Sequence, residues 1–222
     1  MKVLSLSDVV ISRIYSPQVR ALFGDVDLVL GCGDLPYYYL EFIESMLDVP
    51  TYFVRGNHAE VVEYSETGPH THPHGTVDLH CKVVKQNGLL LGGIEGSIRY
   101  RRGPFQYSQS EMWFNVFQLV PQMIMNRLIH GRFLDIFVTH APPWGIHDQP
   151  DLPHHGVKAF CWLLKVFQPA YHFHGHIHIY RPGTDTHTRY HKTEVINTFG
   201  HLVSNIDFES KLKDSADKMH IR

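Results

Sequence analysis

Histidines are concentrated near the end of the sequence, where the stretch 171–178 carries four of them in eight residues. The short apolar run at 170–173 follows Pro169 and is interrupted by Gly175, which predicts a buried strand that ends in a tight turn. Neutral imidazole is a common protein ligand for zinc-like metals, and His176 and His178 on an irregular turn could both face one small volume. A His-x-His pair alone more often means two half-exposed histidines, so a metal site requires partners elsewhere in the chain.

Such partners follow four other predicted strands, each at the point where the strand ends. They are Asp8 after residues 3–6, Asp34 after 26–30, Asn57 and His58 after 51–54, and His140 after 133–138. In α/β sheets the carboxyl ends of parallel strands meet at one edge, and sites gather there. We therefore expect Asp8, Asp34, Asn57, His140, His176 and His178 to lie on one rim and to form a metal site.

The elements that position these residues alternate between strands and helices. We predict helices over 16–24, 36–47 and 157–167, and a helix that begins at a Ser108/Glu111 capping box and is restarted by Pro121. Residues 81–91 read as a hairpin around Asn87-Gly88, and 194–198 as a late strand. This alternation predicts an α/β fold in which helices cover a sheet.

Composition limits the class of protein. The chain has 222 residues, of which 43% are hydrophobic, and this suits one domain over 1–222, with a frayed tail at about 211–222. Its formal net charge of -2 gives no nucleic-acid footprint and no signal for an anionic membrane. Three widely spaced cysteines, and the lack of a signal peptide or a long apolar run, favour a cytoplasmic protein. We expect a small-molecule partner, while the oligomeric state is not predicted.

The ordered blocks Asp8, Gly33-Asp34, Gly56-Asn57-His58, Thr139-His140 and Gly175-His176-x-His178 resemble the calcineurin-like metallophosphoesterase superfamily. The resemblance extends from residue 3 to about residue 200. It implies a four-layer αββα sandwich that holds two divalent metals, with Mn, Fe or Zn equally compatible. The further segments around 139–148, 151–154 and 173–178 look like a bacterial branch of the superfamily.

Carried over to this sequence, the resemblance implies a role for each motif residue. Asp34 would bridge two metals; Asn57, His140 and His176 would complete one site, and Asp8 and His178 the other. His58 would be the catalytic histidine beside the substrate, or alternatively only a hydrogen-bond partner of the ligands. Two cations about 3.5–4 Å apart can generate a hydroxide nucleophile near neutral pH for attack on phosphorus. The implied function is hydrolysis of a phosphomonoester or phosphodiester.

The first motif departs from the superfamily pattern, because many members have Asp-x-His where this chain has Asp8-Val9-Val10. Valine has no lone pair, so the first metal loses a nitrogen ligand. Three interpretations follow: a weaker metal completed by water, recruitment of His174 or of a histidine from the 70–74 loop, or a single metal. We expect two metals of unequal affinity.

Two further alternatives concern function. A metal-binding but inactive interaction scaffold of the same fold is the rival to a hydrolase, although Asn57 and His58 favour the enzyme. Arg99, one of three arginines in the loop after Gly96, is a candidate for substrate binding, and surface exposure alone is the alternative. The histidines at 70, 72 and 74 are expected in a solvated loop.

Overall fold

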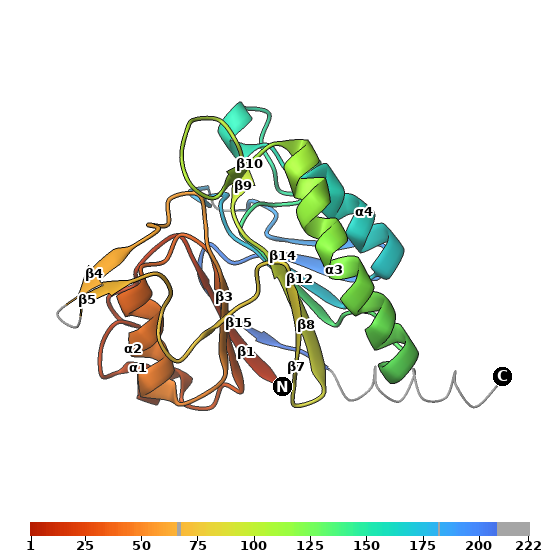
Figure 1. Ribbon diagram of the computed structural model, residues 1–222. Helices are drawn as coiled ribbons and strands as arrows, with labels where there is room; N and C mark the ends of the chain where they lie inside the picture. The colour runs from red at the N-terminus through yellow and green to blue at the C-terminus, as the bar shows by residue number, and fades with distance from the viewer. Residues whose placement is uncertain (66–67, 182, 208–222) are drawn as a thin grey trace.

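The computed structural model describes residues 1–65, 68–181 and 183–207. The tail predicted at 211–222 lies outside these described residues. Two β-sheets pack face to face, and each carries a pair of helices on its outer side (Figure 1).

The first sheet has the strand order β15-β1-β2-β3-β6, in which only β15 is antiparallel to its neighbour. Its strands are β1 (Lys2–Ser7), β2 (Leu28–Cys32), β3 (Thr51–Val54), β6 (Val77–Asp78) and β15 (Gly200–Asn205). The strands β2 and β3 are buried along their whole length, as expected for parallel strands covered on both faces.

Helices α1 (Val19–Phe23) and α2 (Tyr37–Leu47) cover the outer face of this sheet. The predicted start of the first helix at Ser16 is wrong. The Ser16 hydroxyl donates to the Arg13 carbonyl at 2.8 Å and accepts from the Gln18 amide at 3.3 Å. The bond from the Gln18 amide is the one that a capping serine makes, but residues 17–18 form only a turn and the helix begins at Val19.

The second sheet has the strand order β13-β14-β12-β11-β8-β7, with four parallel central strands and antiparallel edges. Its strands are β7 (Lys82–Gln86), β8 (Leu89–Ile94), β11 (Ile136–Thr139), β12 (Tyr171–His174), β13 (His187–Tyr190) and β14 (Thr193–Asn197). The predicted hairpin is confirmed: Asn87 and Gly88 have φ angles of 49° and 86° between β7 and β8.

Helices α3 (Gln109–His130) and α4 (Lys158–Phe167) cover the second sheet. The Ser108/Glu111 capping box is confirmed, but the predicted restart at Pro121 is wrong, because α3 runs through it without a break. Pro121 lies on the exposed face, where water can solvate the carbonyl that loses its amide partner. Of the helices in the described ranges, none combines the length and apolarity needed to cross a membrane.

Three buried cores separate these four layers, one beneath each helix pair and one between the sheets. The middle core joins apolar residues of both sheets, including Leu30 of β2 and Val138 of β11. The predicted α/β sandwich of four layers is therefore confirmed.

Several short elements near the rim were not predicted. The region of the histidines at 70, 72 and 74, expected to be a solvated loop, contains the hairpin of β4 (Glu63–Ser65) and β5 (Gly68–His70), and His70 is the last residue of β5. The pair β9 (Ser97–Ile98) and β10 (Gln106–Tyr107), and the 3-10 turn Leu152–His154, complete the described elements. Strands of two or three residues are too short to give a recognisable alternation in the sequence.

One buried histidine of β12 makes folding stability sensitive to acid. His172 is fully buried, and its Nε2 donates to Thr139 Oγ1 at 2.8 Å because that hydroxyl donates to the Ala141 carbonyl. Burial, and then the charges of neighbouring histidines, lower the pKa of His172 well below its usual 6.5. Below pH 6.5 the unfolded chain therefore binds a proton that the folded chain does not, so the free energy of unfolding falls as the pH falls.

We expect the substitution His172→Phe to flatten this dependence. Phenylalanine retains the aromatic contact with Phe137 and does not titrate, which removes a slope of up to about 1.4 kcal/mol per pH unit below pH 6.5. Urea unfolding of both proteins in chelator at pH 8, 6 and 5 measures the difference. Equal slopes in the two proteins would contradict this account.

Candidate metal centre

The residues of the predicted rim follow the carboxyl ends of five parallel strands. Asp8 follows β1, Asp34 follows β2, Asn57 follows β3, His140 follows β11 and His176 follows β12. The ligand atoms of Asp8, Asp34 and His140 lie within 4.8 Å of one another. The structure thus brings residues from both sheets together at one edge.

The His140 imidazole is the centre of this group and is completely buried. Its Nε2 lies 3.0 Å from Asn57 Oδ1, 3.2 Å from Asp34 Oδ2 and 3.2 Å from His176 Nδ1. Four polar atoms from four different loops therefore converge on one small volume.

The protons on these atoms follow from their second contacts. His140 Nδ1 lies 2.9 Å from the Cys32 carbonyl, and His176 Nε2 lies 2.8 Å from the Pro153 carbonyl. A carbonyl only accepts, so each of these nitrogens carries the ring proton, and the other nitrogen of each ring presents a lone pair. Asn57 adds its carbonyl oxygen and Asp34 a carboxylate, so with both rings neutral the four converging atoms are all acceptors.

Four lone pairs that face one another repel unless a cation lies among them. The two imidazole nitrogens, a carboxylate and an amide oxygen form a donor set that suits Mn, Fe or Zn. Backbone carbonyls that hold the far nitrogen of a ligating histidine are the usual outer support of a metal site. The residues present therefore fit a divalent metal.

The pKa values of His140, Asp34 and His176 agree with this interpretation. Burial opposes charge on His140, but the Asp34 carboxylate outweighs it and raises the pKa of His140 to about 9. Burial likewise opposes charge on Asp34, yet His140 lowers the pKa of Asp34 to about 2. For His176, burial and then the charge of His140 lower the pKa to about 3. The group thus holds one positive charge among its lone pairs, and a metal cation would take the place of that proton.

The second half of the rim has fewer ligands. Asp8 Oδ1 lies 3.7 Å from His178 Nε2, and both Asp8 oxygens accept from the His176 amide at 3.1 Å. The Asp8 side chain is only 1% exposed, whereas His178 is 42% exposed and stacks on Phe199. Val10, at the position where many relatives have histidine, packs against the core beneath α1 and α2.

Unusual backbone geometry directs these side chains to the rim. Asp8, Asp34 and His176 have φ angles of 65°, 53° and 70°, a region that costs a non-glycine residue free energy. Glycines next to them allow close approach: a Cβ on Gly56 would lie 2.1 Å from Asp34 Oδ1. Such strain clusters at functional sites, where the surrounding structure maintains it.

We predict that Gly33→Ala disrupts the group. A Cβ on Gly33 would lie 2.3 Å from His140 Nδ1, and its φ of +94° already disfavours a side chain. The matched control is Gly145→Ala, where φ is +74° but no atom lies within 4 Å of the added Cβ. We expect about 1–2 kcal/mol of destabilisation in the control, and a larger loss, with reduced metal content, in Gly33→Ala. Urea unfolding and metal analysis of both variants provide the measurement, and equal effects would contradict the prediction.

His58 is exposed at the edge of the group, and Asp34 Oδ1 accepts from its amide at 2.7 Å. Arg101 Nη2 lies 3.1 Å from His58 Nδ1, and Tyr100 Oη lies 3.5 Å from His58 Nε2. A guanidinium only donates, so Nδ1 accepts and the ring proton resides on Nε2. The Tyr100 hydroxyl also accepts from Asn57 Nδ2 at 3.2 Å, which links His58 to a ligand of the group.

Other candidate residues lie in different surroundings. The Arg99 guanidinium bonds to both carboxylate oxygens of Glu111, at 2.9 and 3.1 Å, and to the Gln106 carbonyl. The arginine that touches His58 is instead Arg101, and nothing in the sequence distinguishes it from the two arginines beside it. His174 is buried, with Nε2 2.9 Å from His147 Nδ1. His70 and His74 approach Glu41 rather than Asp8.

Comparisons with known proteins agree with this geometry. The sequence profile described as Calcineurin-like phosphoesterase matches residues 1–180. The lariat debranching enzyme of Drosophila melanogaster is 27% identical over 202 residues, covering 69% of this chain and 37% of that protein. The chain therefore spans little more than a third of the length of that curated relative.

Two solved structures share the fold. The protein TT1561 of Thermus thermophilus superposes with a TM-score of 0.59 at 15% identity, covering 90% of this chain and 89% of that one. A second solved chain gives a TM-score of 0.61 at 14% identity, with coverage of 91% and 93%. At these identities the likeness concerns the fold alone.

Proposed function

The chain belongs to the calcineurin-like phosphoesterase family, and from that premise we propose that it is a metal-dependent hydrolase of a phosphomonoester or phosphodiester. The observation that carries this proposal is the convergence of four lone pairs around His140 Nε2, directly beside an exposed histidine. We propose a small phosphorylated molecule as the substrate.

We assign the cation ligands as follows. Asn57, His140 and His176 would hold one divalent cation, Asp8 and His178 the other, and Asp34 would contact both. When bound, such cations supply a water-derived nucleophile at neutral pH and neutralise charge on the phosphoryl group. Because Val10 has no lone pair and packs against the core, the Asp8 side has a poorer ligand set, and we propose that its cation binds more weakly.

His58 and Arg101 would act on the phosphoryl group directly. With its proton on Nε2, neutral His58 can donate a hydrogen bond to a phosphoryl oxygen; as an imidazolium, with Nδ1 also protonated and Arg101 released to the substrate, it can give the Nε2 proton to the leaving oxygen and return to the neutral ring. Arg101 donates to Nδ1, which holds the ring in this tautomer, and its remaining N–H groups are suited to an anionic substrate. An interaction scaffold has no chemical requirement for such a proton donor, so this pair supports the enzyme over the scaffold.

A substrate panel with Mn²⁺ tests the proposal. The panel would contain aryl phosphomonoesters, aryl and linear nucleotide phosphodiesters, cyclic nucleotides and a lariat RNA, the last because of the name of the Drosophila relative. We expect turnover of at least one class that is lost in chelator and restored by metal. Protein shown to contain metal but inactive on the whole panel would contradict the proposal.

A further inference from the structure

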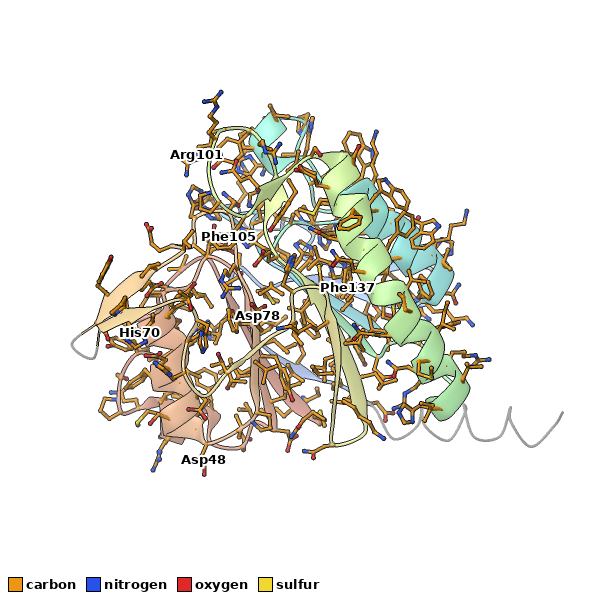
Figure 2. The ribbon with its side chains drawn as sticks, in the orientation of Figure 1. Asp48, His70, Asp78, Arg101, Phe105 and Phe137 are labelled. Atoms are coloured by element: carbon orange, nitrogen blue, oxygen red, sulfur yellow. The ribbon has the colours of Figure 1, made fainter. Side chains whose placement is uncertain are left out.

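A second group of potential metal ligands lies on helix α2 and on the segment that follows β5. The ligand atoms of Glu41, His70 and His74 lie within 4.8 Å of one another. Both histidines belong to the run 70–74, which the family motifs do not include. Figure 2 shows His70 beside α2 and the β4–β5 hairpin, well separated from Arg101 on the loop that reaches His58.

His70 is held in the way that ligating histidines usually are. Its side chain is only 8% exposed, although it belongs to a surface hairpin. Its Nε2 contacts Ser65 Oγ, whose hydroxyl donates to the Gly68 carbonyl at 3.3 Å. The other ring nitrogen, His70 Nδ1, is on the Glu41 side and lies 3.8 Å from Glu41 Oε1. A hydrogen bond on the far nitrogen that orients the ring is characteristic of metal ligands.

The other two side chains complete a compact donor set. Glu41 Oε1 accepts from the backbone amide of His74 at 2.8 Å, which holds the segment against α2. The imidazoles of His70 and His74 pack edge to face, with ring centroids 4.7 Å apart. His74 is exposed, so water could occupy the remaining coordination positions of a cation.

The surroundings of this group carry negative charge. The Glu44 carboxylate lies against the same segment, 2.6 Å from where a Cβ on Gly75 would be placed. Glu63, whose carboxylate accepts from the Tyr37 amide, is also close enough for the charges of Glu41 and His70 to affect its pKa. Several carboxylates around two imidazoles favour a cation over an anion at this position.

We propose that Glu41, His70 and His74 form a second binding site for a divalent cation, and that the bound cation fastens the segment 68–76 to helix α2. Two imidazoles and one carboxylate, with an open position for water, suit Zn²⁺ among the common divalent metals. The site is separate from the group formed by Asp8, Asp34, Asn57, His140 and His176, called the phosphoesterase group below. It does not depend on the function proposed for that group.

The segment that the cation would fasten also contacts the chain leading to the phosphoesterase group. The Thr71 carbonyl accepts from Arg55 Nη2 at 2.8 Å and from the Tyr37 hydroxyl at 3.2 Å. Arg55 immediately precedes Gly56-Asn57. The cation would therefore stabilise a support of the candidate active site without contacting substrate.

Zn²⁺ binding by His74→Ala and His72→Ala tests this site. Both histidines are exposed on the same loop, but only His74 belongs to the ligand set. Titration would be performed in the Asp34→Asn background, so that the phosphoesterase group contributes as little as possible. We expect one equivalent to bind in the background protein and with His72→Ala. With His74→Ala we expect affinity to fall at least about 100-fold, since loss of even an outer support typically costs 10–100-fold.

Hydrogen exchange provides the second measurement. We expect Zn²⁺ to slow amide exchange over 68–76 in the background protein and in His72→Ala, but not in His74→Ala. Equal affinity in the two variants, equal loss in both, or binding without protection of this segment would overturn the proposal. Circular dichroism confirms that the variants are folded.

Discussion

Asp34→Asn is expected to abolish phosphoester hydrolysis and to remove most bound metal. Asp34 Oδ2 lies 3.2 Å from His140 Nε2, Oδ1 accepts from the His58 amide, and we propose that this carboxylate contacts both cations. Charge stabilisation by metals is typically worth several kcal/mol, which corresponds to a loss of roughly 10³-fold in kcat/KM. Asparagine has the same shape and tolerates the same backbone, so the change removes charge without altering the fold.

Asp48→Asn is the matched control for this experiment. Asp48 also has a left-handed backbone, with φ of 55° against 53° for Asp34, but it caps α2 far from the rim (Figure 2). Metal analysis with increasing Mn²⁺, carried out in the His74→Ala background so that the site of Glu41, His70 and His74 does not contribute, should show one tight and one weaker equivalent both with Asp34 intact and in Asp48→Asn. Full metal content and normal turnover in Asp34→Asn would contradict both the ligand assignment and the proposed function.

His58→Ala is expected to lower kcat by roughly 10²–10⁴-fold, the usual contribution of a general acid or base. Metal content should be unchanged, because the contact of residue 58 with Asp34 uses the backbone amide, which alanine retains. The loss should be greater for esters with poorly leaving alcohols than for p-nitrophenyl esters, because only the former need a proton on the departing oxygen.

Two companion variants sharpen the test of His58. Arg101→Ala should cause a smaller loss of the same kind, since it removes the donor to His58 Nδ1 but leaves the imidazole in place. His72→Ala should leave turnover unchanged. An equal loss for good and poor leaving groups in His58→Ala would refute proton donation and leave only a structural role for the ring.

The sequence predicts where the rim residues lie because most of them directly follow strand ends. Apolar runs followed by polar residues identify where β1, β2, β3, β11 and β12 stop, and the carboxyl ends of parallel strands meet at one edge. The capping box of α3 and the Asn87-Gly88 hairpin are equally local, so they too were predicted from short spans of sequence.

The missing parts depend on contacts between distant residues. The carbonyls of Cys32 and Pro153 orient His140 and His176, but residue types do not indicate which backbone carbonyl will lie beside a given side chain. The choice of Arg101 over Arg99 at His58 depends on Glu111, which draws Arg99 away toward the start of α3. The group of Glu41, His70 and His74 joins a helix to a hairpin about thirty residues away, so no spacing rule predicts it.

The pairing of the last described strand with the first has a consequence for synthesis on the ribosome. β15 covers the outer edge of β1, from Lys2 opposite Asn205 to Ser7 opposite Gly200. The nascent chain has all six proposed metal ligands once residue 178 has emerged, while the backbone amides and carbonyls along that edge of β1 still lack their partners. An uncovered strand edge invites pairing with other chains. Chains that terminate before residue 200 should therefore aggregate, even though they contain every ligand of the candidate metal centre.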